Sequence, residues 1–179
     1  MRVGIVGYGR MGREVEAAIG RLGHDVAVIV DPSDPAANHR NLHATLGLRS
    51  EDAEPTSSAT GPARSGGGET DAEGYIDFSV PDSGLQNAVA YLRAGATAVI
   101  GTTGWDTEAL IRAAEAEPGS PARILWGANF STGAQAFFRL VSAAARLLSQ
   151  TGTYDPAIME LHHHGKADRP SGTAIHAAD

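Results

Sequence analysis

The chain has 179 residues and a formal charge of −7, from 14 Lys and Arg against 21 Asp and Glu. This length suits one full domain and part of a second, and a hydrophobic content of 42% suffices for a packed core. The acidic balance without a basic stripe argues against a nucleic-acid binder. The absence of Cys excludes a disulfide framework, a thiolate zinc site and a Cys nucleophile. The apolar run at the N-terminus is interrupted by glycines and is too short for a signal peptide or a membrane span. We therefore expect a soluble cytoplasmic protein.

The first part of the chain predicts a β-α-β unit. Residues 2 to 6 indicate a short buried strand, a helix follows from about Arg10 to Leu22, and residues 25 to 30 indicate a second strand that closes at Asp31. From residue 32 to residue 74 the sequence is rich in Pro, Ser and Gly. We expect there a long, partly mobile connection with one short helix near residues 38 to 47.

Strands and helices alternate again from residue 75. Strands are expected at residues 75 to 80, 97 to 101 and 122 to 126, and helices at residues 81 to 94 and near 106 to 117. This alternation favours a doubly wound α/β fold, an open parallel sheet with helices on both faces. Ligands of such sheets bind at the carboxyl ends of the strands.

The last third predicts a helix, a strand and the start of another helix. Residues 133 to 149 place apolar side chains at helical spacing, and we expect that face in the core. Residues 157 to 161 favour a strand that leads into three histidines, and a helix is expected to begin near Ser171. The sequence stops inside this helix without a capping signal, so we expect a fragment or a truncated gene product.

The first chemical motif is GYGRMG at residues 7 to 12, between a predicted strand and a predicted helix. Glycines there permit a tight turn and close approach of the backbone to a pyrophosphate, and Asp31 stands about twenty residues on, where ribose recognition needs an acid. This context favours a Rossmann-like dinucleotide site over a purely structural turn. The Asp31 carboxylate would repel a 2′-phosphate, which slightly favours NADH over NADPH, although Arg10 and Arg13 are close enough in sequence to offset the repulsion.

Two further loops follow predicted strands, GTTG at residues 101 to 104 and GANF at residues 127 to 130. Each could present backbone and polar groups at the carboxyl edge of the sheet, where a nicotinamide would lie. Taken alone, each loop is equally explained as an ordinary glycine-containing turn between a strand and a helix.

Residues 160 to 174, ELHHHGKADRPSGTA, carry the densest chemistry. An extended segment would place His162 and His164 on one face and His163 on the other. Ser171, Gly172 and Thr173 at a helix start would present N–H and hydroxyl groups to an anion, so a substrate with a carboxylate is the natural ligand. A metal site and a solvated surface histidine cluster are the alternatives, and the spacing does not favour a metal.

Lys166 is the single lysine of the chain, whose other basic side chains are all Arg. An ammonium group is a compact charge that can give up its proton, whereas a guanidinium effectively cannot. Its position beside the histidines therefore favours a functional role over a surface one.

Taken together, the motifs resemble the 4-hydroxy-tetrahydrodipicolinate reductase (dihydrodipicolinate reductase) family. The matching segments are residues 7–12, 76–81 (IDFSVP), 101–104, 128–133 (ANFSTG) and 160–174. The resemblance implies an NAD(P)H-dependent reductase of a cyclic dicarboxylate in the diaminopimelate and lysine pathway. It also implies a dinucleotide-binding domain over residues 1–128, the start of a smaller α+β substrate domain over residues 129–179, and a homotetramer for the full-length family.

The resemblance also implies a role for individual residues. His162 and Lys166 would be catalytic, as the acid/base and the proton donor. The substrate would contact His163, Ser171, Gly172 and Thr173. The cofactor would contact Gly7, Tyr8, Gly9, Arg10, Met11, Gly12, Asp31, Gly101, Thr102, Thr103, Gly127, Ala128, Asn129 and Phe130.

Two other functions stay open at this point. One is a truncated relative that holds a nucleotide without turnover, and the other is a different dehydrogenase acting on sugars or imino acids. The cluster at residues 160–174 argues against the second, because neither a sugar nor a mono-acid needs it.

Overall fold

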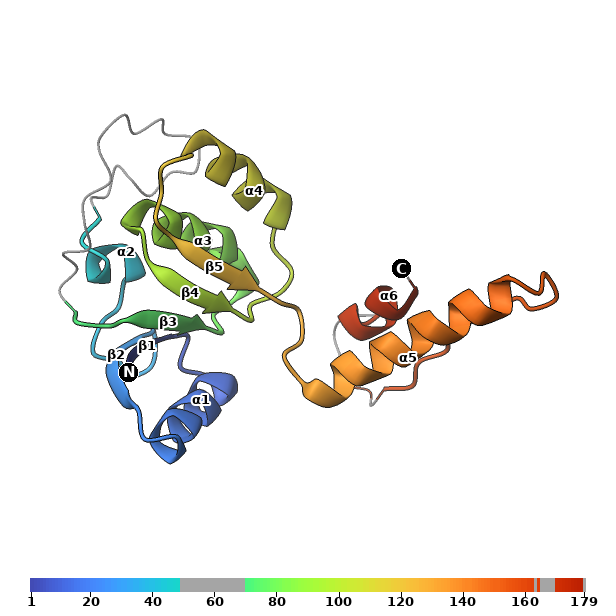
Figure 1. The fold of residues 1–179 in the computed structure, drawn as a ribbon. Coiled ribbons are helices and arrows are strands. Elements are labelled where there is room, and N and C mark those ends of the chain that lie inside the picture. The colour runs from blue at the N-terminus through green and yellow to red at the C-terminus, as the bar shows by residue number, and fades with distance from the viewer. Residues whose placement is uncertain (49–69, 163, 165–169, 179) are drawn as a thin grey trace. The chain divides into compact units, whose positions relative to one another are not determined.

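The computed structural model describes residues 1–48, 70–162, 164 and 170–178. The chain divides into two compact units, Met1–Gly127 and Ala128–Asp179 (Figure 1). Residues 49–69 of the long connection expected over residues 32–74 lie outside the described residues.

The first unit is built on a parallel five-stranded sheet with the order β2-β1-β3-β4-β5. The strands are short apolar segments bounded by glycine, proline or acidic residues. Their bounds are β1 Arg2–Val6, β2 Asp25–Val30, β3 Gly74–Asp77, β4 Thr97–Ile100 and β5 Arg123–Trp126. This order and direction confirm the predicted doubly wound fold.

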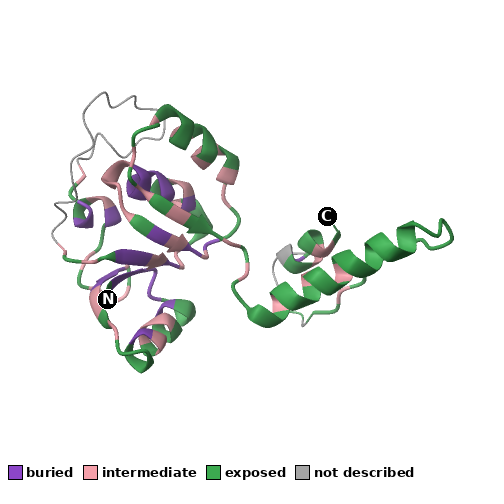
Figure 2. Ribbon diagram, in the orientation of Figure 1, coloured by how far each residue is buried: buried purple, intermediate pink, exposed green. Residues whose placement is uncertain are grey.

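Helices cover both faces of this sheet because side chains of a strand alternate between the two faces. On one face Val3 and Ile5 pack with Ile19 of α1 (Arg10–Arg21). On the other face Val6 packs with Tyr91 of α3 (Pro81–Ala94). The short α2 (Leu42–Thr45) contributes Leu42 to this second core, and α4 (Thr107–Ala116) packs against α3. Figure 2 shows the buried residues gathered along the strands and α3.

Strand β3 ends three residues earlier than the predicted end at residue 80. The Asp77 carboxylate accepts the backbone N–H of Ser79 at 2.9 Å, a local turn that takes the chain out of the sheet. Helix α2 begins four residues later and ends two residues earlier than the short helix expected near residues 38 to 47. The remaining strand and helix ends in this unit differ from the predictions by one residue at most.

The second unit contains α5 (Thr132–Ser149) and α6 (Gly172–Ala178). Both helices were predicted, but the expected strand at residues 157 to 161 is wrong, because this segment has no strand structure. A strand needs a neighbour to pair its N–H and C=O groups, and the described part of this unit offers only helices.

The apolar face of α5 does not form the expected core. Figure 2 shows this helix largely exposed. Phe137 is 52% exposed and Leu140 is 70% exposed. Helix α6 packs beside it, through contacts such as that between the rings of Phe138 and His176, whose centroids are 4.4 Å apart. Helical spacing thus identified the helix, but burial of its face depends on tertiary partners that periodicity does not specify.

Candidate functional site

The loops that follow four neighbouring strands are aligned at the carboxyl edge of the sheet. Each loop begins with an N–H group that donates to the end of the adjacent strand. The bonds run from Gly7 to Val30 O (2.9 Å), Phe78 to Val6 O (2.8 Å), Gly101 to Asp77 O (2.8 Å) and Gly127 to Ile100 O (3.1 Å). The structure thereby brings together the predicted loops at residues 7–12, 101–103 and 127, which lie far apart in the sequence.

The glycines of the GYGRMG loop have different reasons to be glycine. Gly7 has φ +82°, and a Cβ there would lie 2.4 Å from the carbonyl oxygen of Phe78. A Cβ on Gly12 would lie 2.2 Å from the oxygen of Gly7. Gly9 is exposed, and its Cβ would meet nothing within 4 Å. Packing within the chain therefore explains Gly7 and Gly12, whereas Gly9 leaves open the approach to the start of α1.

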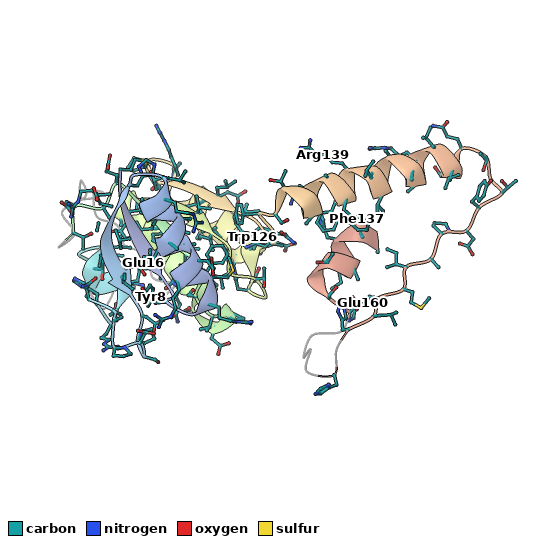
Figure 3. The ribbon with its side chains drawn as sticks, turned by 90° about the horizontal axis from the view of Figure 1, so that it is seen from below. Tyr8, Glu16, Trp126, Phe137, Arg139 and Glu160 are labelled. Carbon is teal, nitrogen blue, oxygen red and sulfur yellow. The ribbon has the colours of Figure 1, made fainter. Side chains whose placement is uncertain are left out.

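Tyr8 turns its side chain inward from the same loop. It is 5% exposed, its hydroxyl donates to the Glu16 carboxylate, and the Arg13 guanidinium lies 4.5 Å from its ring centroid (Figure 3). The bond to Glu16 is the largest cause that raises the pKa of Tyr8 above its ordinary value, followed by burial. The phenol of Tyr8 is therefore buried against α1, and a ligand at this loop would meet the backbone of Tyr8. Arg10 and Met11, which open α1, are exposed.

Asp31 lies at the end of β2, as predicted, and its carboxylate is bonded to backbone. It accepts from the N–H of Tyr8 (2.8 Å), Ser33 (2.8 Å) and Asp34 (2.9 Å). Burial raises the pKa of Asp31, but these three bonds outweigh it and the net pKa lies below the ordinary value. Asp31 thus ties the glycine loop to the turn after β2, a role that the sequence motif did not indicate.

A second carboxylate, Asp77 at the end of β3, is fully buried and was missed by the sequence analysis. It accepts from Ser79 N (2.9 Å), Thr102 Oγ1 (3.1 Å), Asn87 Nδ2 (3.0 Å) and Tyr91 Oη (3.1 Å). Burial, followed by the Asp77 charge, raises the pKa of Tyr91 well above its ordinary value. An acid at the last position of an otherwise apolar strand was the available signal, because a buried charge requires such partners.

Two tryptophans fix the carbonyl of Thr102 in the GTTG loop. The indole Nε1–H groups of Trp105 and Trp126 both donate to it, at 2.7 and 2.9 Å, and their rings meet edge to face with centroids 6.2 Å apart. The Thr102 side chain is bonded to Asp77, whereas Thr103 is exposed. The loop is therefore held from both sides and presents Thr103 to solvent.

Ala128, Asn129 and Phe130 belong to the second unit. Asn129 shapes the start of α5, because its Oδ1 accepts from Ser131 N at 2.8 Å and its carbonyl accepts from Gln135 Nε2 at 2.8 Å. Phe130 is 46% exposed.

The second unit joins three polar residues of the ELHHHGKADRPSGTA segment. Glu160 accepts from Ser171 N (2.9 Å) and Ser171 Oγ (2.6 Å), and its Oε2 lies 2.8 Å from His162 Nε2. Ser171 is buried and also caps α6, because its oxygen accepts from Ala174 N at 3.1 Å. The anion at this helix start is thus the chain's own Glu160, which the sequence analysis did not single out although it stands two residues before His162.

These residues border a cavity of about 400 Å³. Its wall contains Glu160, His162 and Thr173, and its remainder is mainly apolar, with Phe137 of α5 (Figure 3). The predicted site residues His163 and Lys166 lie outside the described residues, and Gly172 begins α6.

Within the described ranges, no three His, Asp or Glu side chains are placed so that they could hold a metal ion. No helix in the part of the chain that the structure covers is both long and apolar enough to cross a membrane.

The fold and the glycine loop define the class, a Rossmann-like α/β domain followed by a smaller unit. Residues 1–130 match the family described as dihydrodipicolinate reductase, N-terminus, and residues 133–179 match dihydrodipicolinate reductase, C-terminus. The chain belongs to the dihydrodipicolinate reductase family.

Individual relatives agree with this assignment. The 4-hydroxy-tetrahydrodipicolinate reductase of Cupriavidus necator is 39% identical over 178 residues, covering 98% of this chain and 63% of that protein. The protein of the same name in Haloarcula marismortui is 41% identical over 111 residues, covering 62% of this chain and 43% of that protein. The chain thus spans less than two thirds of the length of these relatives.

Among solved structures, a dipicolinate-bound dihydrodipicolinate reductase from Paenisporosarcina sp. TG-14 has the same fold. Its TM-score is 0.68 at 23% identity, covering 99% of this chain and 64% of that chain. A probable dehydrogenase from Thermotoga maritima has a TM-score of 0.51 at 11% identity, covering 86% of this chain and 42% of that chain.

The contacts of Glu160 predict an unusual titration. The Ser171 hydroxyl, the His162 ring and the Ser171 N–H lower the pKa of Glu160 from 4.5 to about 2. Because these contacts favour the ionised form, their stabilising effect is present above pH 4.5 and is lost as the pH falls toward 2. Carboxyl-resolved NMR should therefore find the Glu160 midpoint near 2.

The matched control is a pair of Ser→Ala changes. Ser171→Ala should raise the Glu160 midpoint, whereas Ser149→Ala, which removes a hydroxyl bonded to Arg146 O on α5, should leave it unchanged. An ordinary midpoint near 4.5 in the unchanged chain would contradict the arrangement.

Proposed function

We propose that the protein catalyses the NAD(P)H-dependent reduction of 4-hydroxy-tetrahydrodipicolinate to tetrahydrodipicolinate, in the diaminopimelate and lysine pathway. Membership of the family supports the reaction, and the names of the relatives supply its substrate. The observation that carries the proposal is the alignment of three strand-end loops beside an unobstructed Gly9. The dipicolinate named with one structural neighbour supports a dicarboxylate ligand.

The first unit, with the boundary near residue 128, would bind the dinucleotide. Its pyrophosphate would lie against the backbone of Gly7, Gly9 and Gly12, because the start of α1 offers free N–H groups and the positive end of the helix dipole. The ribose would lie near Asp31, and the nicotinamide near residues 101–103 and Gly127. Either NADH or NADPH is accepted, with NADH slightly favoured by the Asp31 carboxylate.

When bound, the reduced nicotinamide supplies a hydride to the unsaturated ring of the substrate. The negative charge that develops there is quenched by a proton from His162 or Lys166.

Substrate carboxylates would be held by His163, Gly172 and Thr173. The N–H and hydroxyl of Ser171, which caps the same helix, are bonded to Glu160, so Ser171 would contact the substrate only by exchanging that partner. Cationic groups beside the substrate carboxylates favour both binding and the charge of the transition state.

Glu160 would act on this chemistry through His162. Its carboxylate lies 2.8 Å from Nε2, so in the neutral ring it favours the tautomer with the proton on Nε2. Nδ1 is then the nitrogen left for proton exchange. We assign Glu160 as a positioning residue and His162 as the group that moves the proton.

A nucleotide-binding protein without turnover is the second candidate. NADH binding without oxidation of NADH in the presence of substrate distinguishes it from the reductase. On the resemblance to the family we further propose a cytoplasmic location and assembly as a homotetramer.

Gly9→Trp tests the nucleotide site. Gly9 has φ −74° and open space around it, so the variant should fold, but the indole would occupy the approach to the start of α1. Calorimetric titration of the 179-residue chain with NADH should show saturable binding that this variant loses.

The control for this substitution is Gly20→Trp. Gly20 lies on the same helix, is exposed, and its Cβ would also meet nothing within 4 Å. It should bind NADH like the unchanged chain. Equal NADH affinity in both variants would show that the dinucleotide does not bind at this loop.

Lys166→Arg and His162→Gln test the proposed chemistry. In a chain extended with the matching C-terminal portion of the Cupriavidus necator relative, either change should lower kcat by about 100-fold or more, the usual effect of positioned acid–base catalysis. KM for the substrate should change less for Lys166→Arg, because the charge is retained. NADH affinity should be unchanged in both variants, and near-normal turnover of Lys166→Arg would rule out this lysine as the proton donor.

A further inference from the structure

We propose that Trp105 and Trp126 are positioning residues for the nicotinamide half of the cofactor, acting through the backbone of Thr102 and Thr103. This inference rests on the proposed dinucleotide-binding function and adds two side chains that the motif analysis did not include. It follows from how the two indoles hold one carbonyl, which donor that carbonyl orients, and where the indoles lie relative to the loops that would receive the nicotinamide.

The carbonyl of Thr102 is held by two side-chain donors. Trp105 Nε1 donates to it at 2.7 Å and Trp126 Nε1 at 2.9 Å, so the indoles occupy both lone pairs of this oxygen. The Thr102 hydroxyl donates to the buried Asp77 carboxylate at 3.1 Å, which fixes the side chain of the same residue. Three hydrogen bonds therefore hold one residue of a loop that has no regular secondary structure.

The orientation of this carbonyl decides where the next N–H group points. In a planar trans peptide the C=O and N–H groups point in opposite directions, so the bonds to Thr102 O also orient the N–H of Thr103. Thr103 is exposed, and within the described ranges no backbone carbonyl accepts its N–H. The loop thus presents an oriented donor at its surface, which suits the carboxamide oxygen of a nicotinamide.

The two indoles are themselves fixed by the fold. Trp105 packs over Gly84 of α3, where a Cβ would lie 2.5 Å from the indole Cδ1. Trp126 is the last residue of β5 and is paired with Ile100 of β4, so the sheet sets its position. The two rings meet edge to face, with centroids 6.2 Å apart. The donors to Thr102 O are therefore supported by α3 on one side and by β5 on the other.

Trp126 also joins the two loops that the nicotinamide would lie against. Gly127 follows it directly and begins the second of these loops, with its N–H bonded to Ile100 O at 3.1 Å. The Trp126 indole reaches the first loop at Thr102. One side chain therefore links the two loops at the carboxyl edge of β4 and β5.

The two halves of the cofactor should depend on different hydrogen bonds. The adenosine half would lie at the glycine loop and Asp31, which are joined by their own bond from Tyr8 N to the Asp31 carboxylate at 2.8 Å. The nicotinamide half would lie where the indoles hold Thr102. Loss of an indole donor should therefore weaken a ligand that contains nicotinamide and spare one that lacks it.

Trp105→Phe and Trp126→Phe test this, because each removes one donor and keeps an aromatic ring. Calorimetry on the 179-residue chain compares NADH with ADP-ribose, which lacks the nicotinamide. Each variant should weaken NADH by about fivefold or more, the factor that corresponds to one neutral hydrogen bond, and change ADP-ribose affinity by less than about twofold. The Thr103 amide resonance of the ligand-free chain should also move in each variant, because the carbonyl of its peptide has lost a donor.

The matched control is Ser120→Ala. The Ser120 hydroxyl donates to Leu92 O at 2.6 Å near the C-terminal end of α3, so this variant also loses a bond from a side chain to a backbone carbonyl. It should change neither ligand affinity nor the Thr103 resonance. Thermal unfolding checks that each variant is folded. Trp126 is 40% exposed, so Trp126→Phe should leave the core intact and carries the test alone if Trp105→Phe unfolds the chain.

Two results would overturn the role of an indole while leaving the nucleotide site standing. One is an unchanged NADH affinity in its Phe variant, and the other is an equal loss of NADH and ADP-ribose. Failure of the unchanged chain to bind either ligand would instead contradict the proposed function and this inference together.

Discussion

The arrangement of the first unit depends on one buried charge, the carboxylate of Asp77. A carboxylate removed from water is stable only when hydrogen bonds replace its hydration. Here the donors come from the strand end, from Asn87 and Tyr91 of α3, and from Thr102 of the next loop, so a single group joins three elements. Loss of one hydrogen bond to a charged group lowers the free energy of unfolding by about 1.5 to 3 kcal/mol, a large fraction of the stability of a small domain.

Asp31, at the end of β2 and two strands away from Asp77, is stabilised in the same way. Its carboxylate accepts backbone N–H groups from the glycine loop and from its own turn, so the loops are shaped by bonds within the chain. The double donation of Trp105 and Trp126 to Thr102 has the same effect on the GTTG loop. A ligand that met this edge would find groups already oriented, which reduces the ordering cost of binding.

Much of the fold was predictable because local patterns determine it. Apolar runs such as residues 25–30 mark strands, and Pro81 and Gly95 mark the ends of α3. The strand expected at residues 157–161 and the buried face expected on α5 were wrong, because both depend on partners that local pattern does not specify. For the site, the motifs singled out Gly9 and Asp31 as candidates, but the hydrogen-bond partners of Asp31, Asp77 and Glu160 became visible only when the fold brought distant segments together. The roles assigned to His163 and Lys166 stay predictions.

The central claim is that the carboxyl edge of this sheet binds a nicotinamide dinucleotide. Amide-resolved NMR of the 179-residue chain during titration with NADH tests it most directly, because every loop at that edge carries backbone N–H reporters. We expect saturable shifts at residues 7–12, 31, 101–103 and 127, and at the Trp126 indole that is bonded to the GTTG loop. Shifts confined to α4, or no saturable shifts at these loops, would contradict it.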